Sequence, residues 1–392
     1  MDSNKKKIDI LFSKLVKYLS DEDKPYVIIR NHFDGDGTTS GAVIEQLLRL
    51  FNLRYRKLVS VQNKYTAYDL INDRNFFRIM KEKIEKESQN GKEQNNKKKI
   101  IYFILDFGSN KETALNMNNL KNYLKNLGFE PFFILIDHHN MEEPKLTKKV
   151  FDIVYHHYEK NTSFLAREFF FRVVKNEEFK KLNIEIPKEA IYFVHEISYV
   201  GVLSDNFEEL LPLFSFPDNK REELIKKYYV IEYITNISKF SDKNINLLWD
   251  IIFNFKEYKN QAAFLEEKLA SYLEKVKNMV NNYDLINGIK IKTIELDKIS
   301  FRNLTFPNPK LFLRYLHSDD EILVVYKDGF IMLRAGQKVD IDFRELIKLQ
   351  EKYPCGPGGH RRRFAISFPE KLTDRILEEI FNFIKEKAKL KD

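Results

Sequence analysis

Two short runs of this chain are almost wholly apolar and are separated by a stretch with helical spacing. The runs are residues 100–105 (Ile-Ile-Tyr-Phe-Ile-Leu) and 132–136 (Phe-Phe-Ile-Leu-Ile), and the stretch between them covers residues 110–127. Such runs are typical of strands that are buried on both faces of a parallel sheet covered by helices. A β-prone run at 26–30 and a helical pattern at 39–50 repeat the alternation. We therefore predict βαβ units in a doubly wound α/β domain.

The hydrophobic pattern changes in the C-terminal third of the chain. Residues 220–285 are rich in Lys, Glu and Leu, and we predict that they are helical throughout. After Asn287-Gly288 the residues at 289–294 alternate with a period of two, which indicates strands. We therefore predict three parts with these boundaries: a catalytic domain at 1–214, a helical insertion or linker at 215–285, and a smaller α+β domain at 286–392.

Acidic and histidine side chains follow three of the predicted strands. The three motifs are His32-Phe33-Asp34-Gly35-Asp36-Gly37, Asp106-Phe107-Gly108 and Asp137-His138-His139. Ligands of open α/β sheets bind outside the carboxyl ends of the strands, so we expect the three motifs to converge there.

Each motif alone has an ordinary structural explanation. Asp and Gly favour turns, a single Asp often caps a helix, and a His pair is often buried and hydrogen-bonded. Asp205, which ends a helical apolar stretch, is explained equally well as a helix-terminal residue. Together, however, so many carboxylates would repel one another unless cations lie among them. Carboxylates with some histidine suit Mn²⁺ or Mg²⁺.

A glycine-rich segment followed by arginines occurs near the C-terminus. It runs Cys355-Gly-Pro-Gly-Gly-His-Arg-Arg-Arg363. Closely spaced glycines let backbone N–H groups approach a phosphate, and the arginines add positive charge. A plain turn with exposed arginines is the alternative. Arg334 is similarly open to two interpretations, nucleic-acid contact or an exposed basic loop. We assign no chemical role to Cys355.

The ordered set H-x-D-x-D-G, D-x-G, D-H-H, G-x-x-x-D and Gly-Gly-His resembles the DHH phosphoesterase superfamily. Within it, the chain resembles most the RecJ-like single-strand exonucleases, especially the archaeal ones, and the resemblance extends from His32 to His360. It implies a parallel-sheet DHH domain, a helical insertion and a smaller DHH-associated domain, with the active site in the cleft between the two domains. His32 departs from the bacterial pattern, which usually has Asp there, but other branches of the superfamily have His.

The resemblance also implies a role for each motif residue. One cation would be held by His32, Asp34 and Asp106, and a second by Asp36, Asp106, His138 and Asp205, with Asp106 shared. The catalytic residues would be Asp137, behind the ligands, and His139, on the scissile phosphate. The substrate-binding residues would be Gly358, Gly359 and His360, with positive charge from Arg361, Arg362, Arg363 and Arg334. Mn²⁺ is the expected metal, with Mg²⁺ as the alternative.

We therefore expect a two-metal exonuclease that releases mononucleotides from single-stranded DNA, RNA or both, in replication, repair or RNA turnover. A nanoRNase or cyclic-dinucleotide phosphodiesterase of the same superfamily is the first alternative. A non-catalytic replisome scaffold is the second, and the intact ligand set disfavours it. The polarity of digestion, the preference for DNA or RNA, the oligomeric state and the protein partners stay open.

Composition adds only coarse limits to this expectation. The 66 Lys and Arg against 58 Asp and Glu give a net charge of +8, which suits an anionic partner but equally a solvated lysine surface. A single cysteine excludes a disulfide framework and fits a reducing, cytoplasmic compartment. No apolar run reaches the length of a membrane span, so we expect no membrane partner.

Overall fold

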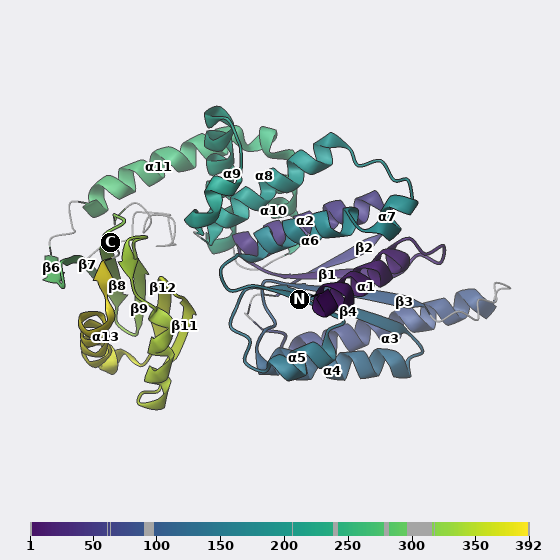
Figure 1. Ribbon diagram of the computed structural model, residues 1–392, viewed down its shortest axis with the longest axis horizontal. Coiled ribbons are helices and arrows are strands. Elements are labelled where there is room, and N and C mark those ends of the chain that lie inside the picture. The colour runs from purple at the N-terminus through teal and green to yellow at the C-terminus, as the bar shows by residue number, and fades with distance from the viewer. Residues whose placement is uncertain are drawn as a thin grey trace. The chain divides into compact units, whose positions relative to one another are not determined.

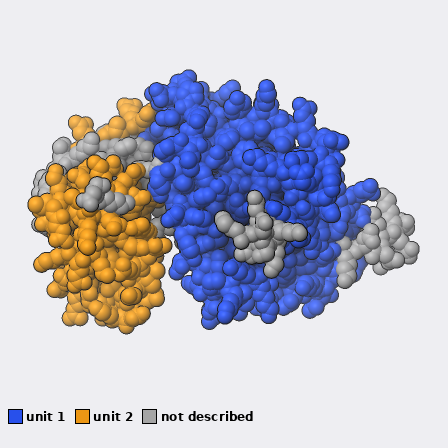
Figure 2. All heavy atoms as spheres, in the orientation of Figure 1, with its two compact units in different colours: residues 1–259 blue, residues 260–392 orange. Residues whose placement is uncertain are grey.

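The computed structural model forms two compact units, residues 1–259 and 260–392, which are coloured separately in Figure 2. It describes residues 2–60, 62, 64–89, 98–205, 207–237, 242–277, 282–295, 316 and 318–390. Among these residues, no helix has both the length and the apolar character needed to cross a lipid bilayer.

Unit 1 is built on a five-stranded sheet in which all neighbouring strands are parallel, in the order β2-β1-β3-β4-β5. The strands are β1 (Tyr26–His32), β2 (Tyr55–Ser60), β3 (Lys99–Leu105), β4 (Glu130–Asp137) and β5 (Ile153–His156). The predicted α/β class and buried parallel strands are thus confirmed. The strand β2 was not predicted, because it is an edge strand whose residues are mostly only half-buried.

Helices cover both faces of this sheet (Figure 1). One face carries α1 (Asp2–Leu19), α2 (Gly35–Leu50), α6 (Thr162–Val174) and α8 (Lys188–Ser204), with the short α7 (Glu177–Lys181) after α6. The other face carries α3 (Ala67–Gln89), α4 (Lys111–Asn126) and α5 (Pro144–Val150).

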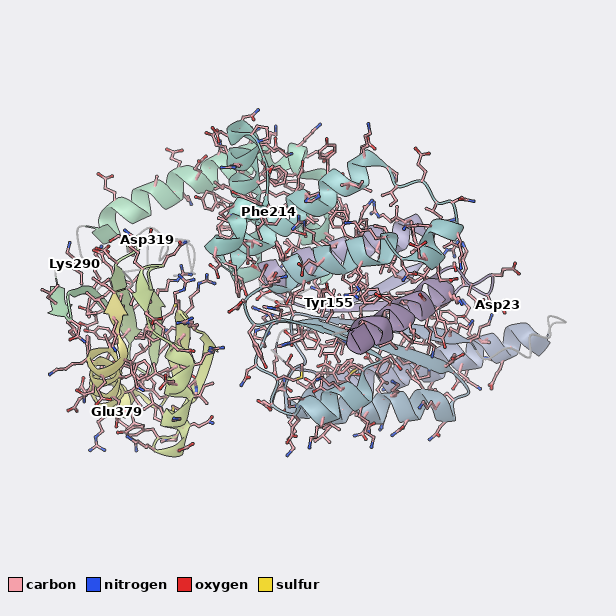
Figure 3. The ribbon with its side chains drawn as sticks, in the orientation of Figure 1. Asp23, Tyr155, Phe214, Lys290, Asp319 and Glu379 are labelled. Atoms are coloured by element: carbon pink, nitrogen blue, oxygen red, sulfur yellow. The ribbon has the colours of Figure 1, made fainter. Side chains whose placement is uncertain are left out.

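The central strand β3 shows why two covered faces require apolar runs. Ile100, Tyr102 and Ile104 belong to the core shared with α3 and α4. Phe103 points to the opposite face, where its ring centroid lies 6.2 Å from that of Phe169 on α6. Tyr155 of β5 packs against the same Phe169, at 5.7 Å (Figure 3). Side chains on alternate sides of the strand therefore both need apolar partners.

The strand order places a topological switch point between β1 and β3. From β1 the chain proceeds through α2 to β2 on one side, and from β2 it returns through α3 to β3 on the other side of β1. Ligands of open α/β sheets bind where the strand order reverses in this way. The first two acidic motifs end these two neighbouring strands.

Two further helices, α9 (Asp218–Ile237) and α10 (Asp242–Asn254), pack onto this unit at α8 and α2. They are preceded by the short η1 (Glu208–Leu213) and followed by η2 (Phe255–Tyr258). The single tryptophan of the sequence, Trp249, is 5% exposed and lies against Gly41 of α2. The division into parts at 1–214, 215–285 and 286–392 stays a prediction.

Unit 2 begins with α11 (Lys259–Lys277) and contains a six-stranded mixed sheet in the order β11-β12-β9-β8-β7-β6. The strands are β6 (Asn282–Ile286), β7 (Ile289–Glu295), β8 (Glu321–Lys327), β9 (Phe330–Ala335), β11 (Gly356–His360) and β12 (Arg363–Ser367). A small pair joins β10 (Val339–Asp340) to β13 (Lys389–Leu390), and η5 (Phe343–Glu351), η6 (Glu370–Leu372) and α13 (Thr373–Lys387) complete the unit. This confirms the predicted smaller α+β part.

The helical prediction for 220–285 is wrong at its end. Residues 282–286 form β6, which pairs antiparallel with β7 across Asn287-Gly288. Both turn residues have positive φ, 51° and 78°, as a tight hairpin between twisted strands requires. The glycine-rich segment, whose Gly and Pro content predicts a loop at 354–359, instead forms an edge strand, β11, from Gly356.

Candidate metal centre

The first motif forms the end of β1 and the start of α2. Asp34 caps α2, and its Oδ1 accepts a hydrogen bond of 2.8 Å from the Gly37 backbone N–H. A Cβ on Gly37 would overlap the carbonyl oxygen of His32, so the turn requires glycine here. Asp36 falls in the first turn of α2 and is fully buried. The tight turn thus brings one imidazole and two carboxylates to the end of one strand.

Asp106 follows β3 in an unusual backbone conformation. Its φ is 65°, in the left-handed region that costs most L-residues energy but that Asp tolerates better than most. Its backbone N–H donates to the carbonyl of Ile136, at 3.0 Å, which ties it to β4. Such outliers cluster at functional sites, where they fix the direction of a side chain.

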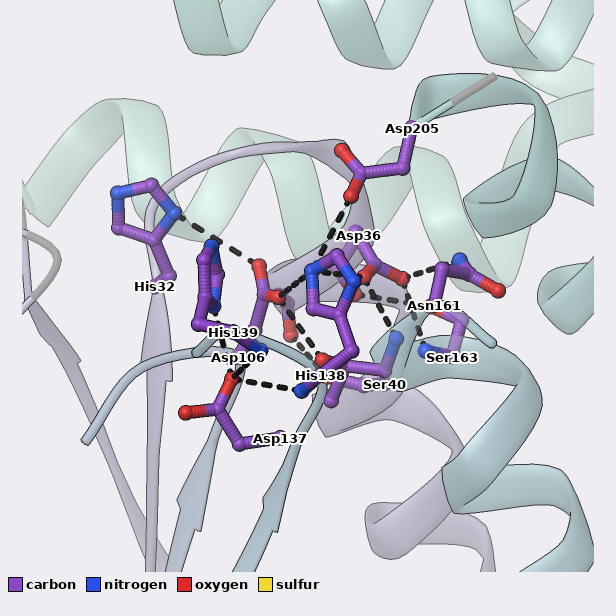
Figure 4. Close-up of polar contacts among 12 residues, drawn as sticks. His32, Asp36, Ser40, Asp106, Asp137, His138, His139, Asn161, Ser163 and Asp205 are labelled. Carbon is purple, nitrogen blue, oxygen red and sulfur yellow. Dashed lines mark hydrogen bonds and ion pairs between the residues drawn. The ribbon is translucent and has the colours of Figure 1, made fainter. Parts of the chain in front are cut away.

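The six predicted ligands lie close together, and Figure 4 labels all of them except Asp34. We call His32, Asp34 and Asp106 the first group. Within it, His32 Nδ1 lies 2.9 Å from Asp34 Oδ2 and 3.7 Å from Asp106 Oδ2. Ligand atoms of these three residues all lie within 4.8 Å of one another, so the group could hold one cation.

The second group consists of Asp36, His138 and Asp205, with Asp106 beside them. Here His138 Nε2 lies 3.2 Å from Asp205 Oδ2 and 3.9 Å from Asp36 Oδ2. It also lies 3.3 Å from Asp106 Oδ1. Ligand atoms of Asp36, His138 and Asp205 again fall within 4.8 Å of one another. The two oxygens of Asp106 therefore face different groups.

The electrostatics of the cluster fit divalent cations. Burial raises the pKa of Asp36 well above its ordinary value, and the charges of Asp106 and Asp205 add to the effect. Burial would also raise the pKa of Asp106, but the neighbouring imidazoles of His138 and His32 hold it well below the ordinary range. The buried carboxylates thus need positive charge beside them. Hard divalent cations favour such an oxygen-rich set with some imidazole.

His32 shows the same need for positive charge. Burial alone would lower its pKa, but the negative charges of Asp34 and Asp106, which lie 2.9 Å and 3.7 Å from Nδ1, raise the pKa to about 10. A cation bound between these side chains would supply the charge that a proton supplies on His32 here.

Asp137 and His139 form a pair beside the two groups. Asp137 is fully buried, and its Oδ2 accepts hydrogen bonds from the backbone N–H and the hydroxyl of Ser109. Its Oδ1 lies 2.8 Å from His139 Nδ1. Although burial opposes both shifts, the attraction within the pair lowers the pKa of Asp137 to about 2 and raises the pKa of His139 to about 9.

His139 lies close enough to the ligands to join them. Its ligand atom falls within 4.8 Å of those of Asp106 and His138, so these three residues are a third possible metal group. His139 is predicted to contact the phosphate and His138 to bind a metal ion, and their side chains differ in solvent exposure. The side chain of His139 is 33% exposed, whereas that of His138 is fully buried.

Three donors beside the carboxylates were not predicted to belong to the site. The sequence Asn161-Thr162-Ser163 predicts a helix cap, with phosphate contact as the alternative, and the side chain of Asn161 does accept from the N–H of Phe164 at the start of α6. The same turn also contacts Asp36 and Asp106, through Asn161, Thr162 and Ser163. No local pattern could have revealed these contacts, because 125 residues separate Asn161 from Asp36.

Another unforeseen contact comes from the helical segment after the site. Glu232 of α9 is 2% exposed and accepts a hydrogen bond from the hydroxyl of Ser204, the residue before Asp205. Its carboxylate also lies against Gly35 of the first motif. The helix α9 therefore contacts both the end of α8 and the start of α2, the two helix ends beside the cluster.

His156 also touches the site without belonging to its ligand groups. Its Nε2 lies 2.7 Å from the carbonyl oxygen of His139. Within the described part of the chain, neither His156 nor His157 joins a potential metal group. Phe33 and Phe107, which lie within the first two motifs, are 8% and 0% exposed and are core residues.

The expected substrate-binding residues lie together in unit 2. Gly358, Gly359 and His360 belong to the edge strand β11, and Arg361 and Arg362 form the turn into β12. A Cβ on Gly358 would meet no atom within 4 Å, so open space adjoins the strand there. Arg363 on β12 is paired in register with Arg334 on β9, which is 6% exposed. Arg361 is exposed and forms an ion pair with Asp340.

Comparisons with known proteins agree with this fold. No protein-family model and no curated protein sequence matches the chain. Among solved structures, a DHH-domain protein described as a member of a family of ribosomal proteins is 19% identical, with a TM-score of 0.66; the match covers 99% of this chain and 92% of that chain. RecJ from Thermus thermophilus, in complex with Mn²⁺, is 10% identical, with a TM-score of 0.51; the match covers 98% of this chain and 56% of that chain.

Proposed function

We propose that this chain, which has the fold of DHH-domain proteins, is a metal-dependent phosphodiesterase that digests single-stranded DNA, RNA or both from an end. One observation carries the proposal: two groups of side chains that could each hold a metal ion are joined by the two oxygens of Asp106. Paired cations bound by shared carboxylates are a recurring device for phosphoryl hydrolysis. Mn²⁺ is the metal we expect, and Mg²⁺ is the alternative.

The ligands in our proposal are His32, Asp34 and Asp106 for one cation, and Asp36, Asp106, His138 and Asp205 for the other. The cations would supply positive charge for the scissile phosphate and would activate water for attack on phosphorus. The protein's contribution is to hold these side chains in a largely buried, fixed arrangement. No side chain needs to act as a covalent nucleophile.

His139 is proposed to contact a non-bridging oxygen of the scissile phosphate. Asp137 holds its Nδ1 at 2.8 Å, and Ser109 in turn holds Asp137, so the orientation of the imidazole ring is fixed. The partial exposure of the His139 side chain fits a residue that meets the substrate. The full burial of the His138 side chain fits a metal ligand.

Binding of the nucleic-acid backbone is proposed for the Gly358–His360 strand and the neighbouring arginines. The open space beside Gly358 would let backbone N–H groups approach a phosphate. Arg361, Arg362 and Arg363 would add charge, and the buried Arg334 would support them from β9. A polymer can place more phosphates against such an extended basic element than a dinucleotide can. This favours a polymer as the substrate. Replication, repair and RNA turnover are the processes in which this activity would serve.

The test is digestion of end-labelled single-stranded DNA, single-stranded RNA, dinucleotides and cyclic dinucleotides with Mn²⁺. We expect mononucleotides from the long strands, and we expect Asp36→Ala and His138→Ala to abolish their release. His157→Ala is the matched control, because His157 lies outside the potential metal groups of the described residues. If only dinucleotides or cyclic dinucleotides are cut, the polymer proposal fails. If none of these substrates is cut, the enzyme proposal fails and the non-catalytic alternative is favoured.

A further inference from the structure

We infer that the first turn of α6, residues 161–163, is a positioning element for the metal centre, and that Thr162 holds the carboxylate of Asp106 in the orientation in which one oxygen faces each ligand group. The inference rests on the proposed metal site and goes beyond its ligands. Helix capping alone would require only the acceptor that Asn161 offers to α6. The turn does more, because it donates hydrogen bonds to two of the buried carboxylates.

Asp36 is held by three donors from this turn (Figure 4). The side-chain amide of Asn161 donates to Asp36 Oδ1 at 2.6 Å, and the backbone N–H of Ser163 donates to the same oxygen at 2.8 Å. The backbone N–H of Thr162 donates to Oδ2, also at 2.8 Å. These N–H groups belong to a helix N-terminus, which favours a carboxylate. With both oxygens engaged, the carboxylate of Asp36 cannot rotate without losing hydrogen bonds.

Asp106 receives its hydrogen bond from the hydroxyl of Thr162. This hydroxyl donates to Asp106 Oδ1 at 2.8 Å, and both residues are at most 1% exposed. Oδ1 is also the oxygen that lies 3.3 Å from His138, whereas Oδ2 lies 3.7 Å from His32. A partial rotation of the carboxylate would break the bond to Thr162 and turn both oxygens away from the two ligand groups. The hydroxyl therefore sets the orientation of the one carboxylate that both ligand groups share.

The turn itself is fixed by its neighbours. Ser163 Oγ donates to the carbonyl oxygen of Asp36 at 2.8 Å and lies 2.5 Å from the hydroxyl of Thr39 on α2. A Cβ on Gly201 of α8 would overlap Ser163 Oγ and Thr39 Oγ1, so α8 approaches as closely as a glycine permits. Hence α2, α6 and α8 together hold the donors in place.

Outer contacts of this kind typically change metal affinity by about 10- to 100-fold when they are lost. We therefore expect Thr162→Val in the full-length chain to weaken Mn²⁺ binding, measured as free Mn²⁺ by electron paramagnetic resonance, by at least about 10-fold. Thr162→Ser keeps the hydroxyl and should restore binding. Thr147→Val is the matched control, because Thr147 is equally buried but its hydroxyl donates to the Glu143 carbonyl at the start of α5.

Asn161→Asp separates positioning from capping and covers the case in which Thr162→Val does not fold. Asp caps a helix as well as Asn does, but it cannot donate to Asp36 and places a second negative charge beside it. We expect this variant to keep the helix content of the wild type, to unfold at a lower temperature because two carboxylates are buried side by side, and to bind Mn²⁺ more weakly.

The outcomes separate this inference from the proposed function. Wild-type Mn²⁺ affinity in both Thr162→Val and Asn161→Asp would overturn the inference. Weakened binding in a protein that hydrolyses no phosphodiester would leave the inference standing and refute the proposed activity. A wild-type chain that binds no Mn²⁺ would refute both.

Discussion

At the scale of single residues, the proposed metal centre depends most on Asp106. It follows a strand that the apolar pattern predicted, and its position past the strand end marked it as a candidate ligand. Its left-handed backbone and its place between two histidines could not be predicted from neighbours in the sequence, because they depend on β4 and on residues of distant motifs.

Asp106→Asn gives the first prediction at this scale. Asn tolerates the left-handed region as Asp does, so the variant should keep the backbone conformation at this position. It lacks the carboxylate that both groups share, and a metal's charge stabilisation is worth several kcal/mol. We expect a loss of Mn²⁺-dependent hydrolysis of about 10³-fold. Activity within a few-fold of wild type would show that Asp106 is not a shared ligand.

Asp137→Asn gives a second prediction. The variant keeps an acceptor for His139 but removes the charge that fixes the imidazole, so we expect the turnover number to fall while Mn²⁺ affinity stays near that of the wild type. Parallel measurements of hydrolysis and Mn²⁺ binding test this. An equal loss of metal binding would mean that Asp137 belongs to the ligand shell.

At the scale of elements, the strands that were predicted are those with both faces buried. A run such as 100–105 can bury all of its side chains only where helices cover both faces of a sheet. The edge strands β2 and β11 lack this apolar pattern. The strand β6 was missed because it directly follows a segment whose composition indicates helix. The contacts of the α6 turn with Asp36 depend on how α2 and α6 pack, which no local pattern reports.

Lys227 in α9 provides a pH prediction for the helical segment. It is 6% exposed, its Nζ donates to the carbonyl of Ile252 near the end of α10, and burial lowers its pKa from 10.5 to about 8. The unfolded chain therefore binds more protons than the folded chain between pH 8 and 10.5, so this group's contribution to stability rises with pH across that window.

The comparison of wild type with Lys227→Met isolates this effect. The free energy of unfolding of the wild type should increase relative to that of the variant as pH rises from 8 to 10.5, by at most about 3 kcal/mol. Urea unfolding at several pH values measures it. A difference that is constant with pH, or that moves the other way, would contradict a buried lysine whose charged form is penalised.

At the scale of the whole molecule, the positive net charge and the acidic candidate metal centre are separate features. The charge excess of +8 describes the full sequence, whereas the centre in unit 1 gathers the carboxylates of Asp34, Asp36, Asp106 and Asp205. Average composition therefore indicated little about the site, and the order of the motifs indicated much more.

The division into two units leads to a prediction about which residues metal binding protects from hydrogen exchange. All six proposed ligands belong to unit 1, so Mn²⁺ should slow hydrogen exchange at the ends of β1 and β3 and at the start of α6. Exchange in β7, β8 and β9 of unit 2 should not change. Protection of the unit 2 sheet by Mn²⁺ alone would show that ligands outside unit 1 take part.

The most direct test of the central claim is the number of Mn²⁺ ions bound per chain at saturation, measured by equilibrium dialysis of wild type and His32→Ala. His32 belongs only to the first ligand group, so its loss should spare the second. We predict two ions for the wild type and one for the variant. A wild type that binds one ion or none, or a variant that binds as many as the wild type, would contradict two ligand groups joined through Asp106.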